Sequence, residues 1–155
     1  YPVEAVEVMA EVAIEAENAL PYEAILLEKR QDLEHQTDDA IAYNACQTAH
    51  QLGAGLIVAF TESGSTAGRV SKYRPSAQIL ALTPSPETQR SLTMNWGVLP
   101  VTTAPARDLD DFFSRVQEEA TKVAGVVSGT LVVLVAGLPI GVPGGTNLLR
   151  VLTVD

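Results

Sequence analysis

Short apolar runs alternate with helical patterns along most of the chain, and this alternation restricts the fold more than any other feature. Leu56–Phe60 is an uninterrupted apolar run of strand length. Further strands are predicted at residues 78–82, 98–102, 130–136 and 148–154. Continuously apolar strands separated by helices are typical of a mostly parallel sheet that is covered on both faces. The pattern therefore predicts an α/β fold, a three-layer α/β/α sandwich with a five-stranded sheet.

The helices are predicted from start signals and from the spacing of apolar residues. They are expected at residues 3–18, 22–31, 38–52, 64–73 and 108–124, with one more opened by Ser85-Pro86-Glu87. One face of the 108–124 helix is apolar, and its residues are Leu109, Phe112, Phe113, Val116, Ala120 and Val123. Residues 1–52 are thus a helical lead-in, and residues 53–155 form the sheet-containing core of a single domain.

The connection before the last strand sets that strand's direction. Only a Gly/Pro-rich segment, residues 137–145, separates the strand at 130–136 from the strand at 148–154. A parallel crossover needs a dozen or more residues. The last strand is therefore expected to run antiparallel to its predecessor.

Composition and charge exclude several classes of function. The chain has 155 residues, of which 46% are hydrophobic and 19% charged, a balance that favours a folded domain. Its longest apolar stretches are too short to cross a bilayer. One cysteine, Cys46, cannot form an internal disulfide, which suits a cytoplasmic location. Because the chain opens on Tyr1-Pro2 without an initiator Met or a signal peptide, it is expected to be a piece of a longer protein.

The acidic residues are concentrated at the start of the chain. Residues 1–39 hold eleven acids against Lys29 and Arg30, which accounts for the whole net charge of −9. Neither half has a basic face, so nucleic acids and anionic membranes are not expected as partners. Within the first helix four glutamates share one stripe: Glu4, Glu7, Glu11 and Glu15. This stripe is either a solvated face or a surface that docks on a basic partner.

A polar turn follows the first strand and leads directly into a helix. It contains Thr61, Ser63, Gly64, Ser65 and Thr66. In parallel sheets ligands bind beyond the carboxyl ends of the strands, and the start of a helix offers free N–H groups and a favourable dipole to an anion. We therefore interpret this turn as a candidate phosphate site, although Ser/Thr-rich turns also serve simply as helix caps.

Basic residues near this turn are few. Between Thr61 and Leu92 four bases face two acids, so this part of the acidic chain is locally positive. Arg69 could approach an anion at the turn, whereas Lys72 and Arg74 suit the end of their helix, where cations are favoured. Glu62 argues against a doubly charged phosphate unless its side chain points away.

The loop after the fourth strand is a second candidate, because it emerges at the same edge of the sheet. Its predicted effector-loop residues are Gly141, Pro143, Gly144 and Gly145. Glycine permits close backbone approach, and proline limits flexibility. The loop is either a flap over a ligand or only the connection of a hairpin.

No catalytic or metal site is expected. Gly64-Ser65-Thr66-Ala67-Gly68 resembles a nucleophile elbow, but such an elbow needs a histidine later in the chain, and His35 and His50 both precede it. Two histidines and one cysteine give no zinc-binding spacing. Cys46, in an Ala-rich helix, is expected to be a small buried apolar residue, and His50 a packed or surface residue.

Several segments, taken in order, resemble pyruvate kinase over essentially the whole chain. They are Tyr1-Pro2-Val3-Glu4-Ala5-Val6, Thr61-Glu62-Ser63-Gly64 with Thr66-Ala67, Ser71-Lys72-Tyr73-Arg74-Pro75, Ile79-Leu80-Ala81-Leu82-Thr83, Trp96-Gly97-Val98 with Pro100-Val101, and residues 141–147 with Arg150-Val151. The resemblance implies the C-terminal regulatory domain of such an enzyme, which binds allosteric effectors and forms one interface of a homo-tetramer.

The resemblance also implies what this chain lacks. Transfer of phosphate from phosphoenolpyruvate to ADP, with magnesium and potassium, takes place in a catalytic barrel domain, so the chain alone is expected to be inactive and to hold no cofactor. The family's phosphate-binding loop is similar to Thr61, Ser63, Gly64, Ser65 and Thr66 here.

Two departures from the family bear on the effector. Members activated by fructose 1,6-bisphosphate often have a basic residue where this chain has Glu62, and basic or aromatic residues in the loop that matches residues 138–145. A sugar monophosphate or a nucleoside monophosphate is therefore favoured over the bisphosphate. Two alternatives remain: an assembly module without effector binding, and a small free-standing enzyme acting on phosphate esters.

Overall fold

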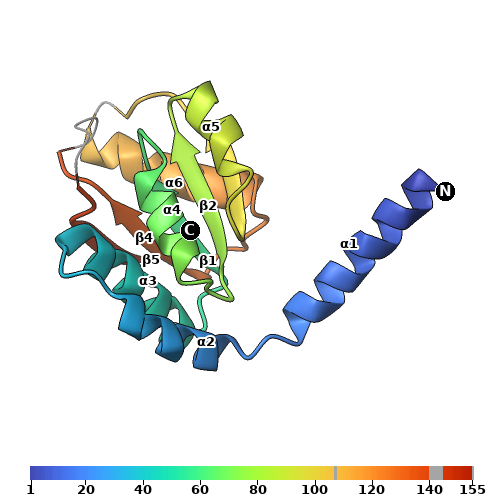
Figure 1. Ribbon diagram of the computed structural model, residues 1–155. Helices are drawn as coiled ribbons and strands as arrows, with labels where there is room; N and C mark the ends of the chain where they lie inside the picture. Colours follow the sequence, from blue (N-terminus) through green and yellow to red (C-terminus); the bar gives the residue numbers. More distant parts are fainter. Residues whose placement is uncertain (107, 140–144, 155) are drawn as a thin grey trace.

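A single five-stranded sheet forms the centre of the protein (Figure 1). The structure is a computed structural model, and it describes residues 1–106, 108–139 and 145–154. The strands are β1 (Leu56–Phe60), β2 (Gln78–Thr83), β3 (Val98–Thr102), β4 (Leu131–Ala136) and β5 (Leu148–Thr153). Their order across the sheet is β3-β2-β1-β4-β5. The predicted strands are all present, with ends that differ by at most one residue.

Strand directions follow from the lengths of the connections. β1 pairs in parallel with β2 and with β4, and β2 pairs in parallel with β3. β5 runs antiparallel to β4, with Leu131 opposite Thr153 and Ala136 opposite Leu148. The prediction of an antiparallel last strand is confirmed. β1, in the middle of the sheet, is buried along its whole length because strands and helices enclose it on every side.

Helices cover both faces of the sheet, so the α/β fold has the three layers expected. They are α1 (Pro2–Asn18), α2 (Tyr22–Lys29), a 3-10 turn (Arg30–Asp32), α3 (Thr37–Leu52), α4 (Ser65–Lys72), α5 (Pro86–Leu92) and α6 (Leu109–Lys122). Ile57 and Ala59 of β1 join a core with α3 and α4, whereas Val58 and Phe60 join a core with α6. Side chains of alternate residues on a strand point to opposite faces, which explains the two cores. Figure 1 shows α4 and α6 on opposite sides of the sheet.

Helix α1 lies apart from this body. It extends away from the sheet, and α2 follows it after a short turn (Figure 1). None of its residues is buried, including Val6, Met9, Val12 and Ile14. The predicted helix is confirmed, and within the described part of the chain its apolar side chains have no core to join.

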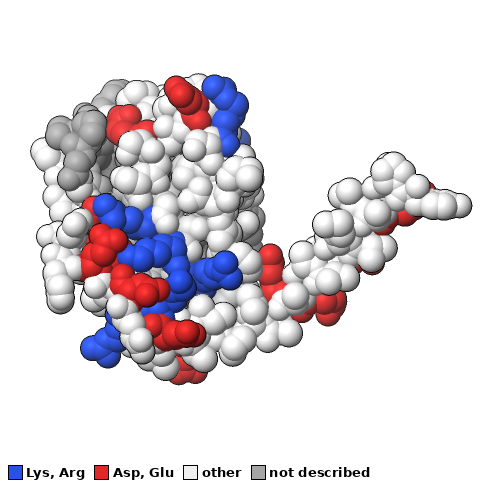
Figure 2. All heavy atoms as spheres, viewed as in Figure 1, with Lys and Arg blue, Asp and Glu red and all other residues white. Residues whose placement is uncertain are grey.

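A buried carboxylate connects α3 to α4. Asp39, near the start of α3, is fully buried. It accepts hydrogen bonds from the hydroxyl of Tyr73 at 2.6 Å, the ammonium of Lys72 at 3.1 Å and the backbone N–H of Glu34 at 2.7 Å. Figure 2 shows acidic and basic side chains gathered side by side on this face. Because a buried charge is tolerated only with such partners, these contacts fix how the two helices pack.

The same contacts determine how Asp39 titrates. Burial alone would raise the pKa of the Asp39 carboxyl, but the hydrogen bonds from Tyr73, Glu34 and Lys72 outweigh it and hold that pKa below its ordinary value of 3.8. A carboxyl with a lowered pKa stabilises the fold above its unfolded-state pKa. That contribution is lost as the pH falls through the lowered value.

We predict that Tyr73→Phe lowers the free energy of unfolding by about 2 kcal/mol, because it removes a hydrogen bond to a charged group. Tyr43→Phe is the matched control, since the Tyr43 ring packs edge-on against Tyr73 and its hydroxyl accepts a hydrogen bond from Gln47 in a part-buried position. The control should cost less than about 1 kcal/mol. Urea unfolding monitored by circular dichroism measures both, and equal losses would contradict the role given to Asp39.

Candidate functional site

The turn at residues 61–66 lies at the carboxyl end of β1 and is held by backbone and side-chain contacts. The N–H of Thr61 donates to the carbonyl of Leu82 at 2.9 Å, which ties the turn to β2. The Thr61 Oγ1 accepts a hydrogen bond from the N–H of Gly64 at 2.9 Å. Gly64 has a φ of 89°, a left-handed conformation that favours glycine, and α4 begins at the next residue. The turn is therefore a compact strand-to-helix junction.

The five predicted phosphate-binding residues do lie together, but their hydroxyls differ in accessibility. Ser63 and Ser65 are exposed, and their oxygens are 3.3 Å apart. Thr61 and Thr66 are buried, with 3% and 6% of their surfaces exposed. The Thr66 Oγ1 lies 2.8 Å from the Thr146 Oγ1 and shares a hydrogen bond with it. Two hydroxyls thus face solvent, and two have partners inside the protein.

Backbone donors add to the exposed hydroxyls. The residue that precedes α4, Gly64, has no side chain with which to cap the helix, and no side chain accepts its first N–H groups in the described contacts. The positive end of the helix dipole therefore lies next to Ser63 and Ser65, whose side chains are exposed. This arrangement can bind an anion through N–H and O–H donors.

The base of the predicted effector loop is firmly held. Asn147 pairs with the backbone of Leu138 in both directions, since its Oδ1 accepts from the N–H and its Nδ2 donates to the carbonyl, each at 2.8 Å. A Cβ on Gly137 would lie 2.6 Å from the carbonyl oxygen of Gly145, so this close approach requires glycine. Of the predicted loop residues, only Gly145 is described. The others lie outside the described residues: Gly141, Pro143 and Gly144.

Three of the four bases between Thr61 and Leu92 are engaged elsewhere, and the fourth, Arg90, is exposed in the last turn of α5. Arg69 pairs with Asp38 of α3 at 2.8 Å, and Lys72 pairs with Asp39. Arg74 lies over the ring of Trp96, 4.9 Å from its centre. The expectation that Arg69 approaches an anion at the turn is wrong for this structure, because the acidic start of α3 holds its guanidinium. The site therefore depends on neutral donors.

The remaining reactive groups behave as structural residues. Cys46 is 1% exposed with its Sγ 3.7 Å from the carbonyl of Val70, and burial raises the pKa of its thiol to about 12. It is a small buried residue, as predicted, whereas His50 is exposed. Among the described residues no group of three acids, histidines or cysteines is placed to hold a metal ion. In that same part of the chain no helix is long and apolar enough to cross a membrane.

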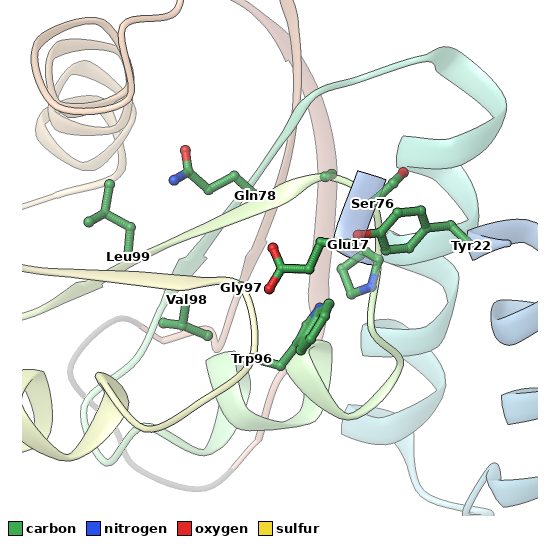
Figure 3. Close-up of a pocket in the computed structure, with 10 residues that line it drawn as sticks. Glu17, Tyr22, Ser76, Gln78, Trp96, Gly97, Val98 and Leu99 are labelled. Atoms are coloured by element: carbon green, nitrogen blue, oxygen red, sulfur yellow. The ribbon is translucent and has the colours of Figure 1, made fainter. Parts of the chain in front are cut away.

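A cavity of about 390 Å³ lies at the opposite edge of the sheet, where β2 and β3 begin (Figure 3). Its wall includes Tyr22, Gln78, Trp96 and the carboxylate-bearing Glu17. No lysine or arginine is among the residues that line it. A phosphate has no cationic partner there and would meet a carboxylate, so this cavity does not compete with the 61–66 turn for such a ligand.

The fold is that of an α/β domain whose central strand β1 leads into α4 through a hydroxyl-rich turn. The family model described as "Pyruvate kinase, alpha/beta domain" matches residues 39–152. The chain therefore belongs to the family of pyruvate kinase α/β domains. It is 41% identical to a pyruvate kinase of Clostridium acetobutylicum and 42% identical to one of Methylorubrum extorquens, over 100% and 97% of its length.

Solved structures agree with this assignment. A crystal structure of a pyruvate kinase from Cryptosporidium parvum matches all of the chain with a TM-score of 0.89 and 29% sequence identity. The match covers 30% of that chain, and the two bacterial matches cover 33% and 32% of those proteins. The chain thus spans about a third of the length of the relatives it resembles.

Sequence reasoning missed two residues that shape the turn. Thr146 shares a hydrogen bond with Thr66 across 80 positions of sequence, and Thr88 of α5 donates to the carbonyl of Glu62 at 2.9 Å. The order of the strands could have indicated both residues. Loops after neighbouring parallel strands meet at one edge of the sheet, so small hydroxyl residues just after other strands were candidates for contact with the turn.

We predict that Gly64→Ala is more destabilising than Gly53→Ala by about 1 kcal/mol. Both glycines have a positive φ, so both substitutions carry a backbone cost, and the larger φ of Gly64 (89°, against 64° at Gly53) adds to the difference. At Gly53 a Cβ would meet open space, whereas at Gly64 it would lie 3.3 Å from side-chain atoms of Thr88 and of Leu92. Thermal and urea unfolding of the two variants measure the difference. Equal losses would show that α5 gives way to the added methyl group without cost.

Proposed function

We propose that this chain is the effector-binding and assembly domain of a pyruvate kinase, and that the 61–66 turn binds the phosphate group of a metabolite. The observation that carries the proposal is the start of α4, which lacks a side-chain cap and lies beside the exposed hydroxyls of Ser63 and Ser65. Phosphoryl transfer from phosphoenolpyruvate to ADP, with its magnesium and potassium, is assigned to a catalytic barrel outside this chain.

The composition of the turn favours a ligand with one phosphate. Its donors are neutral, the nearest basic side chain of α4, Arg69, is paired with Asp38, and Glu62 adds a negative charge next to Ser63. A second phosphate would need cationic partners, and both basic residues of α4, Arg69 and Lys72, are already paired with acids of α3. We therefore propose a sugar monophosphate or a nucleoside monophosphate rather than fructose 1,6-bisphosphate. Gly141, Pro143, Gly144 and Gly145 remain proposed contacts on the other side of such a ligand.

An assembly role rests on the exposed surface of α1. Four of its five glutamates (Glu4, Glu7, Glu11 and Glu15) occupy roughly a quarter of the circumference at 3.6 residues per turn. Most of the rest of the circumference is Val, Ala, Met and Ile, yet none of these residues is buried. Helices that are apolar on most sides are normally buried, and in proteins most of the stability of a helix comes from such packing. We propose that the barrel domain and a second copy of the chain cover α1 in a tetramer.

One observation favours the second candidate, an assembly domain that binds no effector. The side chains of Thr61 and Thr66 are buried, and the Thr66 hydroxyl shares a hydrogen bond with Thr146, so fewer hydroxyls are accessible to a ligand than the sequence predicted. Binding experiments with defined variants distinguish the two candidates.

We predict that the double variant Ser63→Ala/Ser65→Ala weakens binding of ribose 5-phosphate or AMP at least tenfold, because hydrogen bonds to a charged group are worth about 1.5–3 kcal/mol each. Ser76→Ala/Ser91→Ala is the matched control, since both of those serines are exposed and lie outside the turn. Calorimetric titration of the 155-residue chain measures the dissociation constants. Heat of binding that is equal in the two double variants would place the ligand elsewhere, and no heat with either ligand would favour the assembly-only candidate.

We predict that Val6→Glu disrupts assembly of a pyruvate kinase that contains this chain but hardly affects the chain alone. Val6 is 64% exposed here, so its replacement should change the free energy of unfolding of the 155-residue chain by less than about 0.5 kcal/mol. In the whole enzyme the new charge would be buried without a partner. Val127→Glu, at a residue 71% exposed and outside α1, is the control.

Sedimentation velocity of the whole enzyme reads out this assembly prediction. The tetramer should dissociate in the Val6→Glu variant and persist in the control. An intact tetramer in both variants would exclude α1 from the interfaces.

A further inference from the structure

Helix α5 contacts the 61–66 turn from the side of β2. The Thr88 Oγ1 donates to the carbonyl of Glu62 at 2.9 Å, within a part-buried contact. Thr88 and Leu92 also close the space beside Gly64, where a Cβ would meet each of them at 3.3 Å. The backbone of the turn therefore cannot shift toward α5 without moving that helix.

The next residue of the same helix holds the edge strand. The Gln89 Nε2 donates to the carbonyl of Pro100 at 3.2 Å, and the Gln89 Oε1 accepts from the hydroxyl of Thr102 at 2.7 Å. Both ends of the amide are used, so one side chain fixes two points on β3. In the described part of the chain β3 pairs with β2 alone, which makes it an edge of the sheet.

The contacts of Thr88 and Gln89 connect the 61–66 turn to β3 through α5. Neighbouring residues on a helix point about 100° apart, so Thr88 can face the turn while Gln89 faces β3. The start of α5 is itself anchored, because the Ser85 Oγ accepts from the N–H of Thr88 and the N–H of Ser85 donates to the Thr83 Oγ1.

We propose that Thr88 and Gln89 are positioning residues, through which α5 couples anion binding at the 61–66 turn to the edge strand β3. An anion that accepts hydrogen bonds from the turn pulls on the backbone of residues 62–64, and the Glu62 carbonyl passes this displacement to Thr88. Gln89 then shifts the backbone of β3 at Pro100 and Thr102. The inference rests on the proposed phosphate site and adds the route by which anion binding there affects the edge strand β3.

Titration of the ¹⁵N-labelled 155-residue chain with inorganic phosphate tests the coupling. Amide resonances of residues 63–67 report the turn, and those of Leu99, Val101 and Thr102 report β3. In the unmodified chain both sets should shift with one dissociation constant. In Gln89→Met the turn should still shift while the β3 shifts disappear. Gln47→Met is the matched control, because Gln47 also uses its side-chain amide on a helix, toward the hydroxyl of Tyr43.

Thr88 provides a second, independent readout. Thr88→Val keeps the shape of the side chain but removes the donor, and it should weaken phosphate binding about fivefold, the factor that corresponds to one ordinary hydrogen bond. Thr88→Ser restores the hydroxyl and should restore the affinity. Thr93→Val is the control, since its hydroxyl donates to the Arg90 carbonyl at the far end of the helix.

The outcomes separate this inference from the proposed function. Shifts in the turn without shifts in β3, or β3 shifts that persist in Gln89→Met, would overturn the coupling while leaving the phosphate site intact. Equal weakening by Thr88→Ser and Thr88→Val would show that packing, and not the hydrogen bond, matters. If phosphate shifts neither set of resonances in the unmodified chain, the phosphate site and the coupling both fall.

Discussion

The left-handed conformation of Gly64 is the constraint on which the geometry of the candidate site at the 61–66 turn depends. With a φ of 89° and its N–H bonded to the Thr61 Oγ1, this residue turns the chain from the central strand β1 directly into α4. A Cβ at Gly64 would lie only 3.3 Å from side-chain atoms of Thr88 and Leu92, which pack against the turn. The same geometry leaves the first N–H groups of α4 without a side-chain cap, next to the exposed Ser63 and Ser65. The shape of the turn, the uncapped start of α4 and the contact with α5 therefore all follow from the conformation of Gly64.

Much of the fold could be predicted from local patterns. The apolar runs of β1, β2 and β4 are buried on both faces, so their composition identified them without any knowledge of their neighbours. The antiparallel β5 followed from the length of a single connection. The environment of α1 could not be predicted, because a helix with apolar residues on most sides normally lies in a core. In the described part of the chain, however, none of its residues is buried.

The candidate site was predicted less completely than the fold. Sequence placed Thr61, Ser63, Gly64, Ser65 and Thr66 in one turn, which is where the structure has them. It could not distinguish the exposed serines from the buried threonines, because that division depends on β2, α5 and the residues before β5. It also left Arg69 free to approach an anion, whereas Asp38 holds it. Partners distant in the sequence decide both points, and a single sequence does not reveal them.

The most direct test is a crystal structure of the 155-residue chain with tungstate, a tetrahedral anion whose anomalous scattering locates it without ambiguity. The account predicts one principal anomalous peak within hydrogen-bond distance of the N–H groups of Ser65 and Thr66 and of the Ser63 hydroxyl. A 61–66 turn that stays empty at saturating tungstate, or a principal peak beside Arg74 or Arg150 instead, would contradict it.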